Sequence, residues 1–356
     1  MSSPDCGREI KPHIEIRMGL GLEGSPYEPT VSVIIPAMNA EATIGDLLES
    51  LMRVDYARDK LEIIVVDGGS TDGTEKIVKM YPVKLIVERR RGINVARNTG
   101  VKNSRGEIIL FTDADCVVTE DWIKVMVRNF EDPEVGCVGG TVVRYRDDFL
   151  SRYADSSVMP VLRRFKKREV LENVKLFLRY PAGCNMALRR KVIEEAGGFD
   201  ENILYGFDED ELVERACRMG YKMVLDPNSV IKHQHRSSLR TLLKQTFNYG
   251  RGGALLLRRR GIKESIPRWI MATLTLFLAW LAACVALAFL ASTVNVLFLV
   301  PLLSITVLPL VILTAFYFVK ALKSGEYVIA FTYPLIDFLR LFVFCTGGLY
   351  GVITAH

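Results

Sequence analysis

The sequence predicts a doubly wound α/β domain followed by a C-terminal transmembrane domain of three helices. Two observations predict this division. Short apolar runs alternate with helix-like segments from residue 31 to residue 111, as in a sheet that helices cover on both faces. Charged residues make up 24% of the chain but nearly disappear after Ile266, where long apolar segments follow one another.

The strands and helices of the expected α/β domain follow in a regular order. The first strand, residues 31–35, ends at Pro36, and the second, residues 61–66, is a nearly continuous apolar run. Such a run is typical of a parallel strand that is buried on both faces. The other expected elements are helices at residues 42–52, 73–80 and 93–102 and strands at residues 83–87 and 107–111.

Polar residues gather where these strands end, which is where ligands bind in doubly wound sheets. They are Asn39, Asp67, Asp72, Asp113 and Asp115. Residues 148–178 are basic, amphipathic and aromatic; between a solvated face and a helix at a membrane interface, we favour the helix. The remaining expected elements are a helix and a strand within residues 122–147, a helix at 206–220, and short strands at 223–225 and 230–232.

The C-terminal part contains three apolar segments, residues 270–292, 294–319 and 327–353, each able to cross a bilayer as a helix of ~20 residues. Basic residues precede the first segment and follow the second, whereas the loop between them has no Lys or Arg. By the positive-inside rule, this pattern places the α/β domain on the cytoplasmic side of the cell membrane. We therefore divide the chain into an N-terminal extension (1–29), the α/β domain (30–236), amphipathic interface helices (237–268) and the transmembrane domain (269–356).

Composition argues against several other classes of protein. The start of the chain lacks the apolar core of a signal peptide, so we expect the membrane anchor to be C-terminal. The net charge is +5, and its basic clusters suit phosphates or anionic lipids; no nucleic-acid recognition pattern accompanies them. The seven cysteines lack C-x-x-C or C-x-H spacing, which argues against a zinc site and against a disulfide framework.

Asp113 and Asp115 form an Asp-x-Asp at the end of an apolar strand. Two carboxylates there can hold Mg²⁺ or Mn²⁺ against a diphosphate, because hard cations prefer oxygen ligands. Asp67 ends the second strand, where a carboxylate can accept a hydrogen bond from a nucleobase or a ribose. Asp72 can do the same or can cap the helix that follows it. Arg97 lies in a helix that opens with a glycine turn, and it is placed to neutralise a phosphate.

Two further groups of charged residues allow two interpretations each. Four acids, Asp208 to Glu211, begin the helix expected at 206–220, where they either favour the helix dipole or provide a general base for an acceptor hydroxyl. Asp337 and Arg340 lie three residues apart in the third apolar segment. Either they neutralise each other, or Arg340, with the basic residues 258–260, receives the phosphates of a lipid acceptor.

Together these motifs resemble the family 2 glycosyltransferases. The resemblance rests on residues 31–36 with Asn39 and Glu41, VVDGGSTDGT at 65–74, GINVARNTG at 92–100, TDAD at 112–115 and the acidic helix, in this order. It covers residues 31–253 and implies a GT-A fold, which is a doubly wound, Rossmann-like catalytic domain. It also implies inversion at the anomeric carbon and a metal-assisted nucleoside-diphosphate leaving group. The donor contacts that it implies are Pro36, Asn39, Glu41, Asp67, Arg97 and Asp113, with Asp115 as the metal ligand.

The resemblance leaves the catalytic base open. The family usually carries Glu-Asp in the acidic helix, with the Asp as the base. Counting back from Leu212 places Glu209 at that position, whereas matching the Glu-Asp pair selects Asp210. We keep both residues and prefer Asp210.

Other residues resemble parts of related sites. His233 or His235 resembles the third metal ligand of some GT-A enzymes, although a structural histidine fits the sequence equally well. Gln245 and Tyr249 resemble a variant of the Gln-x-x-Arg-Trp acceptor motif of cellulose synthases, with both last residues changed. With three spans and interface helices, the chain looks like a minimal cellulose-synthase-like enzyme, and it resembles the archaeal mannosyltransferases of N-glycan assembly.

The resemblance therefore implies a membrane-bound, inverting glycosyltransferase that depends on Mn²⁺ or Mg²⁺. We favour transfer of a hexose, mannose from GDP-mannose, to a polyprenyl- or dolichyl-linked acceptor in glycan assembly. Two alternatives stay open. One is a polyprenyl-phosphate sugar synthase, whose phosphate acceptor would need no carboxylate base. The other is a non-catalytic nucleotide-binding membrane scaffold.

Overall fold

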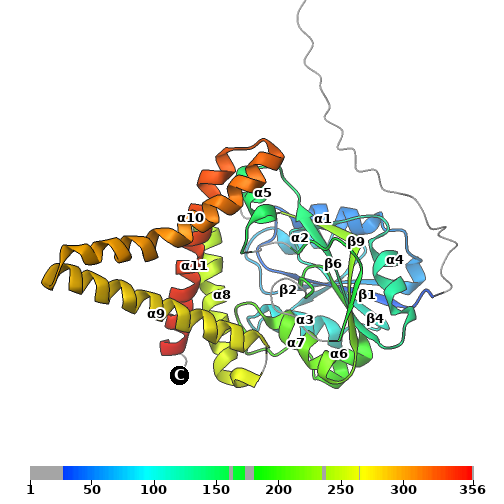
Figure 1. The fold of residues 1–356 in the computed structure, drawn as a ribbon. Coiled ribbons are helices and arrows are strands. Elements are labelled where there is room, and N and C mark those ends of the chain that lie inside the picture. The colour runs from blue at the N-terminus through cyan, green and yellow to red at the C-terminus, as the bar shows by residue number, and fades with distance from the viewer. Residues whose placement is uncertain (1–26, 160–162, 173–179, 235–237, 264, 355–356) are drawn as a thin grey trace, which may run out of the picture.

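The computed structural model describes residues 27–159, 163–172, 180–234, 238–263 and 265–354. An α/β domain forms one part, and the long helices from α8 (Leu239–Arg260) to α11 (Val328–Thr354) extend from one side of it (Figure 1). Most of the predicted N-terminal extension lies outside the described residues, as does His235.

The sheet begins with four parallel strands in the order β3-β2-β1-β4. All residues of β4 are buried, as its apolar run predicts, and the predicted bounds of α3 agree with the structure. The strands are β1 (Val31–Ala37), β2 (Leu61–Asp67), β3 (Lys84–Val87) and β4 (Ile108–Phe111). The helices between them are α1 (Ile44–Met52), α2 (Thr74–Val78) and α3 (Ile93–Lys102).

The second half of the sheet is mixed. β8 runs antiparallel to β4 and β6 antiparallel to β8, whereas β9 is parallel to β6. Both β5 and β7 run antiparallel to β9. The doubly wound parallel pattern therefore holds for the first four strands only. The bounds are β5 (Cys116–Val118), β6 (Val135–Arg144), β7 (Glu169–Leu171), β8 (Met186–Arg189) and β9 (Lys222–His233).

β9 replaces the two short strands predicted at 223–225 and 230–232. Its register against β6 passes from Asp226 opposite Gly140 to Val230 opposite Thr141, so residues 227–229 leave the ladder. The interrupted apolar pattern of this segment reflects that irregularity and not the end of a strand.

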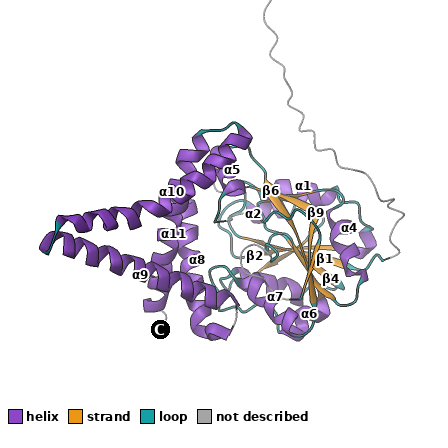
Figure 2. Ribbon diagram, viewed as in Figure 1, coloured by secondary structure: helices purple, strands orange, loops and turns teal. Residues whose placement is uncertain are grey.

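The other helices of the α/β domain are short (Figure 2). The interface helix predicted for residues 148–178 is wrong in extent, because α5 ends at Ser156 and residues 169–171 form β7. The open edge of β9 satisfies the backbone groups of that segment, which outweighs its helical amphipathicity. The helices are α4 (Trp122–Val127), α5 (Phe149–Ser156), α6 (Arg190–Ala196) and α7 (Asp208–Arg218). Single 3-10 turns occur at Arg58–Lys60, Arg128–Glu131, Gly261–Lys263 and Val296–Phe298.

Three C-terminal helices are long and apolar enough to cross a membrane, as predicted. Almost none of the residues in the most apolar part of α9 and of α10 are fully buried within the chain, whereas half of those in the most apolar part of α11 are. Helices of this kind need an apolar surrounding, so this is a membrane protein. The helices are α9 (Ser265–Thr293), α10 (Leu299–Ser324) and α11 (Val328–Thr354), preceded by α8 (Leu239–Arg260).

Glycines let α8 lie directly against α11. A Cβ atom added at Gly250 would stand 2.0 Å from the carbonyl oxygen of Phe344, and one at Gly347 would stand 2.1 Å from that of Phe247. No side chain fits at such distances, so the two backbones touch because both residues are glycine. This crossing joins the membrane helices to α8 and, through α8, to the α/β domain.

A buried polar network ties α11 to the end of α5. Asp337 accepts hydrogen bonds from the hydroxyl groups of Tyr153 (2.5 Å) and Tyr317. Arg340 donates to the Met159 carbonyl at 2.8 Å and to the Tyr153 hydroxyl at 3.0 Å. Arg340 is 4% exposed, and its Nη1 lies 3.8 Å from Asp337 Oδ1. The self-neutralising pair that the sequence suggests is therefore present, and it anchors the α/β domain on α11.

We expect Asp337→Ala to destabilise the protein by about 3–5 kcal/mol, because it leaves the buried charge of Arg340 unpaired. Thermal unfolding of the full chain in detergent measures the change. Replacing Asp337 and Arg340 together with Leu should recover part of the loss, since no buried charge remains. The control is Lys79→Ala, which breaks an exposed pair with Glu75 and should cost less than about 1 kcal/mol. Equal stability of Asp337→Ala and the wild type would contradict the anchoring role.

Candidate active site

The loops after β1 and β2 are joined by side chains that the sequence assigns to the donor. Asn39 Oδ1 accepts the Thr71 N–H at 2.9 Å, and Glu41 Oε2 accepts the Gly73 N–H at 3.0 Å. Pro36 lies within β1, close to where this loop begins. These residues hold the two loops together, and their contact with a donor stays a prediction.

Asp67 and Asp72 serve the second of these loops. Asp67 is fully buried, and its Oδ2 accepts the N–H groups of Gly69 (3.0 Å) and Ser70 (2.8 Å). Asp72 Oδ1 accepts the N–H of Thr74, the first residue of α2, at 3.0 Å, although the N-cap residue of that helix is Gly73 and not Asp72. The hydrogen bond from the Thr74 hydroxyl holds the pKa of Asp72 below its usual range. Donor binding by these two carboxylates also stays a prediction.

A cavity of about 580 Å³ lies between the α/β domain and helices α8, α9 and α11. Its polar wall comes from the α/β domain: Arg97, Asp113, Asp115, Asp208, Glu209, Asp210 and His233. Its apolar wall includes residues of the membrane helices: Ile266, Trp269, Leu341 and Phe344. The residues predicted to bind the acceptor, Gln245, Tyr249 and Arg340, line it too. The described lining does not include Pro36, Asn39, Glu41, Asp67 or Asp72.

Asp113, Asp115 and His233 form a compact group in this cavity. The two carboxylates follow β4 and the imidazole ends β9, and their ligand atoms all lie within 4.8 Å of one another. His233 Nε2 is 3.4 Å from Asp115 Oδ1. One buried oxygen of Asp113 and one of Asp115 accept no hydrogen bond from the described residues. Buried carboxylate oxygens without donors, next to an imidazole, fit a divalent cation such as Mn²⁺ or Mg²⁺.

Arg97 contacts carboxylates. Its guanidinium, on α3, is 2% exposed; it pairs with Asp208 and lies 3.7 Å from Asp113 Oδ1. Burial raises the pKa of Asp113, and the charge of Arg97 opposes that shift. Gly183 allows the close approach, because a Cβ there would stand 2.4 Å from Arg97 Nη2. Arg97 therefore positions Asp113. A phosphate bound next to Arg97 would share its guanidinium with Asp208 and Asp113.

The four acids that begin α7 have separate roles. Asp208 pairs with Arg97, and Glu211 is held by arginines of α7 and α8. Glu209 and Asp210 line the cavity. These contacts add to the favourable helix-dipole position that the four acids share in the first turn of α7.

Glu209 and Asp210 have environments suited to proton transfer. Burial raises the pKa of Glu209 to about 7, and the charge of Asp208 adds to the shift. Burial also raises the pKa of Asp210 well above its usual range, with the charge of Glu209 adding to it. Among the charges that act on each carboxylate, Arg163 favours ionisation of Asp210 and Arg97 favours ionisation of Glu209. A carboxylate tuned toward neutral pH is an efficient general base.

Aromatic side chains face the same carboxylates. Gln245 Nε2 donates to the Tyr249 hydroxyl at 3.0 Å, and the side chain of Tyr249 is 40% exposed. Its ring lies 6.4 Å from that of Phe207, which has a left-handed φ of 64° at the start of α7. This conformation is rare and strained for a bulky residue, and such strain gathers at functional sites. An exposed ring in a polar cavity offers a stacking surface for a sugar.

Arg163 is a cation that faces the cavity near Asp210. Its guanidinium stacks on the ring of Tyr180, with 3.9 Å between Cζ and the ring centroid. Among the described residues no carboxylate forms an ion pair with Arg163, whereas the adjacent Arg164 pairs with Asp155 at 2.7 Å. Arg163 is therefore available to an anionic group in the cavity.

Comparison with known proteins places this chain in a family. The sequence model of "Glycosyl transferase family 2" matches residues 32–197. The glycosyltransferase AglE of Haloferax volcanii is 31% identical over 233 residues, which cover 63% of this chain and 73% of AglE. The chain belongs to glycosyl transferase family 2.

Two further proteins extend the comparison of this family 2 glycosyltransferase. Dolichyl N-acetyl-alpha-D-glucosaminyl phosphate 3-beta-D-2,3-diacetamido-2,3-dideoxy-beta-D-glucuronosyltransferase of Methanococcus voltae is 26% identical over 247 residues, covering 64% of this chain and 74% of that protein. The mannosyltransferase PcManGT of Pyrobaculum calidifontis, solved with GDP-Man and Mn²⁺, matches with a TM-score of 0.62 at 23% identity. The match covers 93% of this chain and 88% of that chain. With the family, this likeness confirms the predicted GT-A fold.

One predicted site of this family 2 glycosyltransferase has competing partners within the chain. Arg340 lines the cavity, and it donates hydrogen bonds to protein acceptors, including the Thr246 hydroxyl at 3.2 Å. Arg259 and Arg260 pair with Asp200, and the described cavity lining does not include residues 258–260. A joint phosphate site of Arg340 and this cluster therefore stays a prediction, and the acidic partners of Arg259 and Arg260 compete with it.

Proposed function

We propose that this family 2 glycosyltransferase moves a hexose from a nucleoside diphosphate to a lipid-linked acceptor. The shared cavity is the observation that carries the proposal. Asp113 and Asp115 line its polar end, and Trp269 and Phe344 of the membrane helices line its apolar end. An acceptor with a polar head and a long apolar chain has the chemistry of both ends.

We favour GDP-mannose as the donor, Mn²⁺ or Mg²⁺ as the cation, inversion at the anomeric carbon, and a cytoplasmic catalytic domain. The structural neighbour solved with GDP-Man and Mn²⁺ supports the donor and the cation, and the dolichyl phosphate in the name of the Methanococcus relative supports the acceptor class. Asp113, Asp115 and His233 would hold the cation, which when bound stabilises negative charge on the departing diphosphate.

The residues of the chain divide the remaining work. Asp210 takes the proton of the acceptor hydroxyl as that oxygen attacks the anomeric carbon. Tyr249, which lines the same cavity, offers its ring to the acceptor sugar. Arg163 meets the acceptor phosphate, since it lines the same cavity and its charge acts on Asp210.

The full chain in detergent tests this function. It is incubated with a panel of nucleoside diphosphate sugars, each with Mn²⁺ or Mg²⁺, and with lipid acceptors extracted from membranes. Mass spectrometry should find one added hexose on a lipid-linked product, with GDP-mannose the preferred donor and with no product after chelation of the metal. Transfer to soluble glycans alone would contradict the lipid acceptor, and donor preference for another nucleotide would contradict GDP-mannose.

We expect Arg163→Gln to raise KM for the lipid acceptor by about 10–100-fold, because a hydrogen bond to a charged group contributes about 1.5–3 kcal/mol. Hydrolysis of the donor without acceptor should fall much less. Arg164→Gln is the matched control, because the neighbouring arginine pairs with Asp155 and does not line the described cavity. An unchanged KM for Arg163→Gln, or equal effects of the two substitutions, would remove the phosphate contact.

A further inference from the structure

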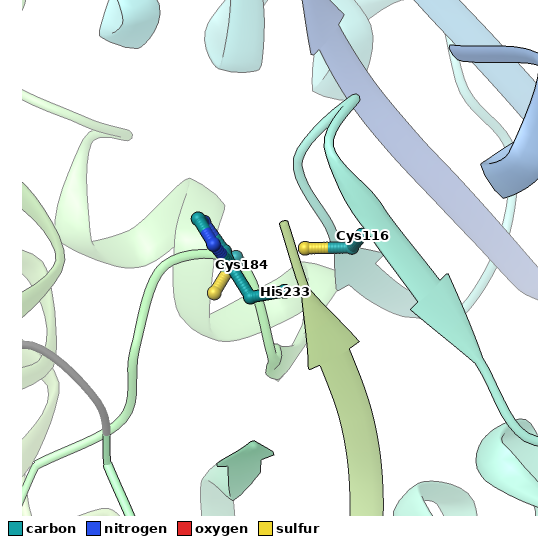
Figure 3. Close-up of side chains that lie close together, drawn as sticks. All are labelled: Cys116, Cys184 and His233. Carbon is teal, nitrogen blue, oxygen red and sulfur yellow. The ribbon is translucent and has the colours of Figure 1, made fainter. Parts of the chain in front are cut away.

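Three side chains from distant parts of the chain meet next to the carboxylate pair. The ligand atoms of Cys116, Cys184 and His233 all lie within 4.8 Å of one another. Figure 3 shows them gathered between β5, the end of β9 and the loop that leads into β8. Both cysteines are buried, and both are free thiols. The proposed transfer reaction gives these thiols no role.

The fold holds all three side chains in place. Cys116 and His233 stand directly opposite each other in the antiparallel pair of β5 and β9, so their side chains share one face of the sheet. Cys184 lies in a turn closed by the hydrogen bond from the Asn185 N–H to the Ala182 carbonyl at 2.8 Å. The side chain of Asn185 is itself fully buried and hydrogen-bonded, which fixes this turn.

A second pair of cysteines shows what is particular about this group. Cys137 on β6 and Cys217 on α7 are close enough for Cys217 to influence the pKa of Cys137, which burial chiefly raises. No described histidine or carboxylate forms a metal-sized group with that pair. Buried cysteines of that kind act as small apolar residues. Cys184 and His233, in contrast, line the cavity, so an ion can reach them.

We propose that Cys116, Cys184 and His233 form a binding site for a soft divalent cation of the zinc and cadmium class. Thiolate sulfur and imidazole nitrogen are the preferred ligands of these ions, whereas Mg²⁺ and Mn²⁺ prefer oxygen. Zn–S bonds of about 2.3 Å in a tetrahedral site hold two sulfurs about 3.8 Å apart, so small side-chain movements suffice. Each thiol releases its proton to solvent as its metal–sulfur bond forms, and the cavity has room for water as the fourth ligand.

The site shares one ligand with the carboxylate group, because His233 belongs to both. An imidazole turned toward the sulfurs leaves Asp113 and Asp115 with one ligand fewer for a hard cation. A soft cation therefore competes with Mn²⁺ or Mg²⁺ and inhibits transfer. This consequence rests on the proposed function, whereas the soft-cation site itself does not.

The test is a Cd²⁺ titration of the full metal-free chain in detergent, kept reduced with a phosphine, in a Cys6→Ser background. Bonds between Cd²⁺ and thiolate absorb in the near ultraviolet, and we expect this absorption to saturate at a single equivalent per chain. Cys116→Ser and Cys184→Ser should each weaken Cd²⁺ binding by about tenfold or more, since even an outer-shell partner of a metal is worth that much. Cys217→Ser is the matched control and should leave the titration unchanged.

Each outcome decides the proposal. Absence of thiolate absorption in the parent chain would overturn it, and this measurement stands even where a serine variant fails to fold. Equal absorption in the parent and in folded Cys116→Ser and Cys184→Ser would overturn it too. Mn²⁺-dependent binding of GDP, measured without Cd²⁺, separates the two proposals. Cadmium binding without GDP binding would uphold this site and contradict the proposed donor. GDP binding without cadmium binding would support the proposed donor and overturn this site.

Discussion

Replacing Asp210 with asparagine is expected to lower kcat for transfer by about 10²–10⁴-fold, which is the usual loss when a general base is removed. Asp210 lines the cavity, and one of its buried oxygens accepts no hydrogen bond from the described residues. Burial raises its pKa, and the charge of Arg163 opposes that shift. Glu209 responds instead to Arg97, on the side of the predicted metal ligands. Steady-state transfer to the lipid acceptor measures the loss, and donor affinity measured by calorimetry should stay unchanged.

The variant Glu209→Gln and the pH profile separate the two carboxylates. A protonated Asp210 cannot accept a proton, so transfer falls as the pH drops below its pKa, which burial and the charge of Glu209 raise. Glu209→Gln removes that charge and should move the acidic limb of the profile to lower pH while kcat at high pH changes little. If Glu209 is the base, Glu209→Gln lowers kcat strongly. The acidic limb of the wild-type pH profile then lies near the pKa of Glu209, which is about 7. If neither substitution slows transfer, the acceptor needs no carboxylate base, as in a polyprenyl-phosphate sugar synthase.

The features that the sequence could predict depend on neighbouring residues. α3 has the predicted bounds because its apolar spacing, its glycine start and its polar end lie within a dozen residues. Asp113 and Asp115 could be placed in the cavity because an apolar run marks the strand that carries them. Three membrane helices follow in the same way from length and hydropathy.

The features that it could not predict depend on pairing between distant segments. β8 lies between β4 and β6 and runs antiparallel to both. No pattern within its few residues predicts that pairing. The partner of Arg97 is Asp208, 111 positions away in the sequence. No local pattern indicates that pair, so we predicted a phosphate as the partner of Arg97. Arg163 sits in a basic segment whose amphipathic pattern indicated an interface helix, and only its stacking on Tyr180 places it in the cavity.

Some signals were present in the sequence but needed the structure to acquire meaning. Gly347 and Gly351 of α11 have the spacing of a small-x-x-x-small motif, which predicts close helix packing without naming the partner. The structure identifies that partner as α8, through Phe247 and Arg251. Cys116 and Cys184 lack the spacing of a metal motif because a sheet register and a turn, rather than a short loop, bring them together.

We expect Asp115→Ala to weaken metal-dependent binding of nucleoside diphosphate by more than about 10–100-fold. Loss of a residue that only contacts a metal ligand costs about that much, and loss of a direct ligand should cost more. Asp115 supplies one carboxylate of the group that includes Asp113 and His233, so two candidate ligands would remain. Titration calorimetry with GDP and Mn²⁺, and Mn²⁺ paramagnetic resonance without nucleotide, measure the change.

Stability measurements show whether such a loss is local to the site. The charge of Asp115 adds to the shift by which burial raises the pKa of Asp113, so the two carboxylates repel each other in the metal-free protein. Removing Asp115 relieves that repulsion, and the metal-free variant should unfold at or above the wild-type temperature. Asp55→Ala is the control, because that carboxylate is exposed and pairs with Lys124 away from the cavity. Unchanged GDP affinity with Mn²⁺ would exclude Asp115 from the metal site, and weaker binding together with a lower unfolding temperature would make its role structural.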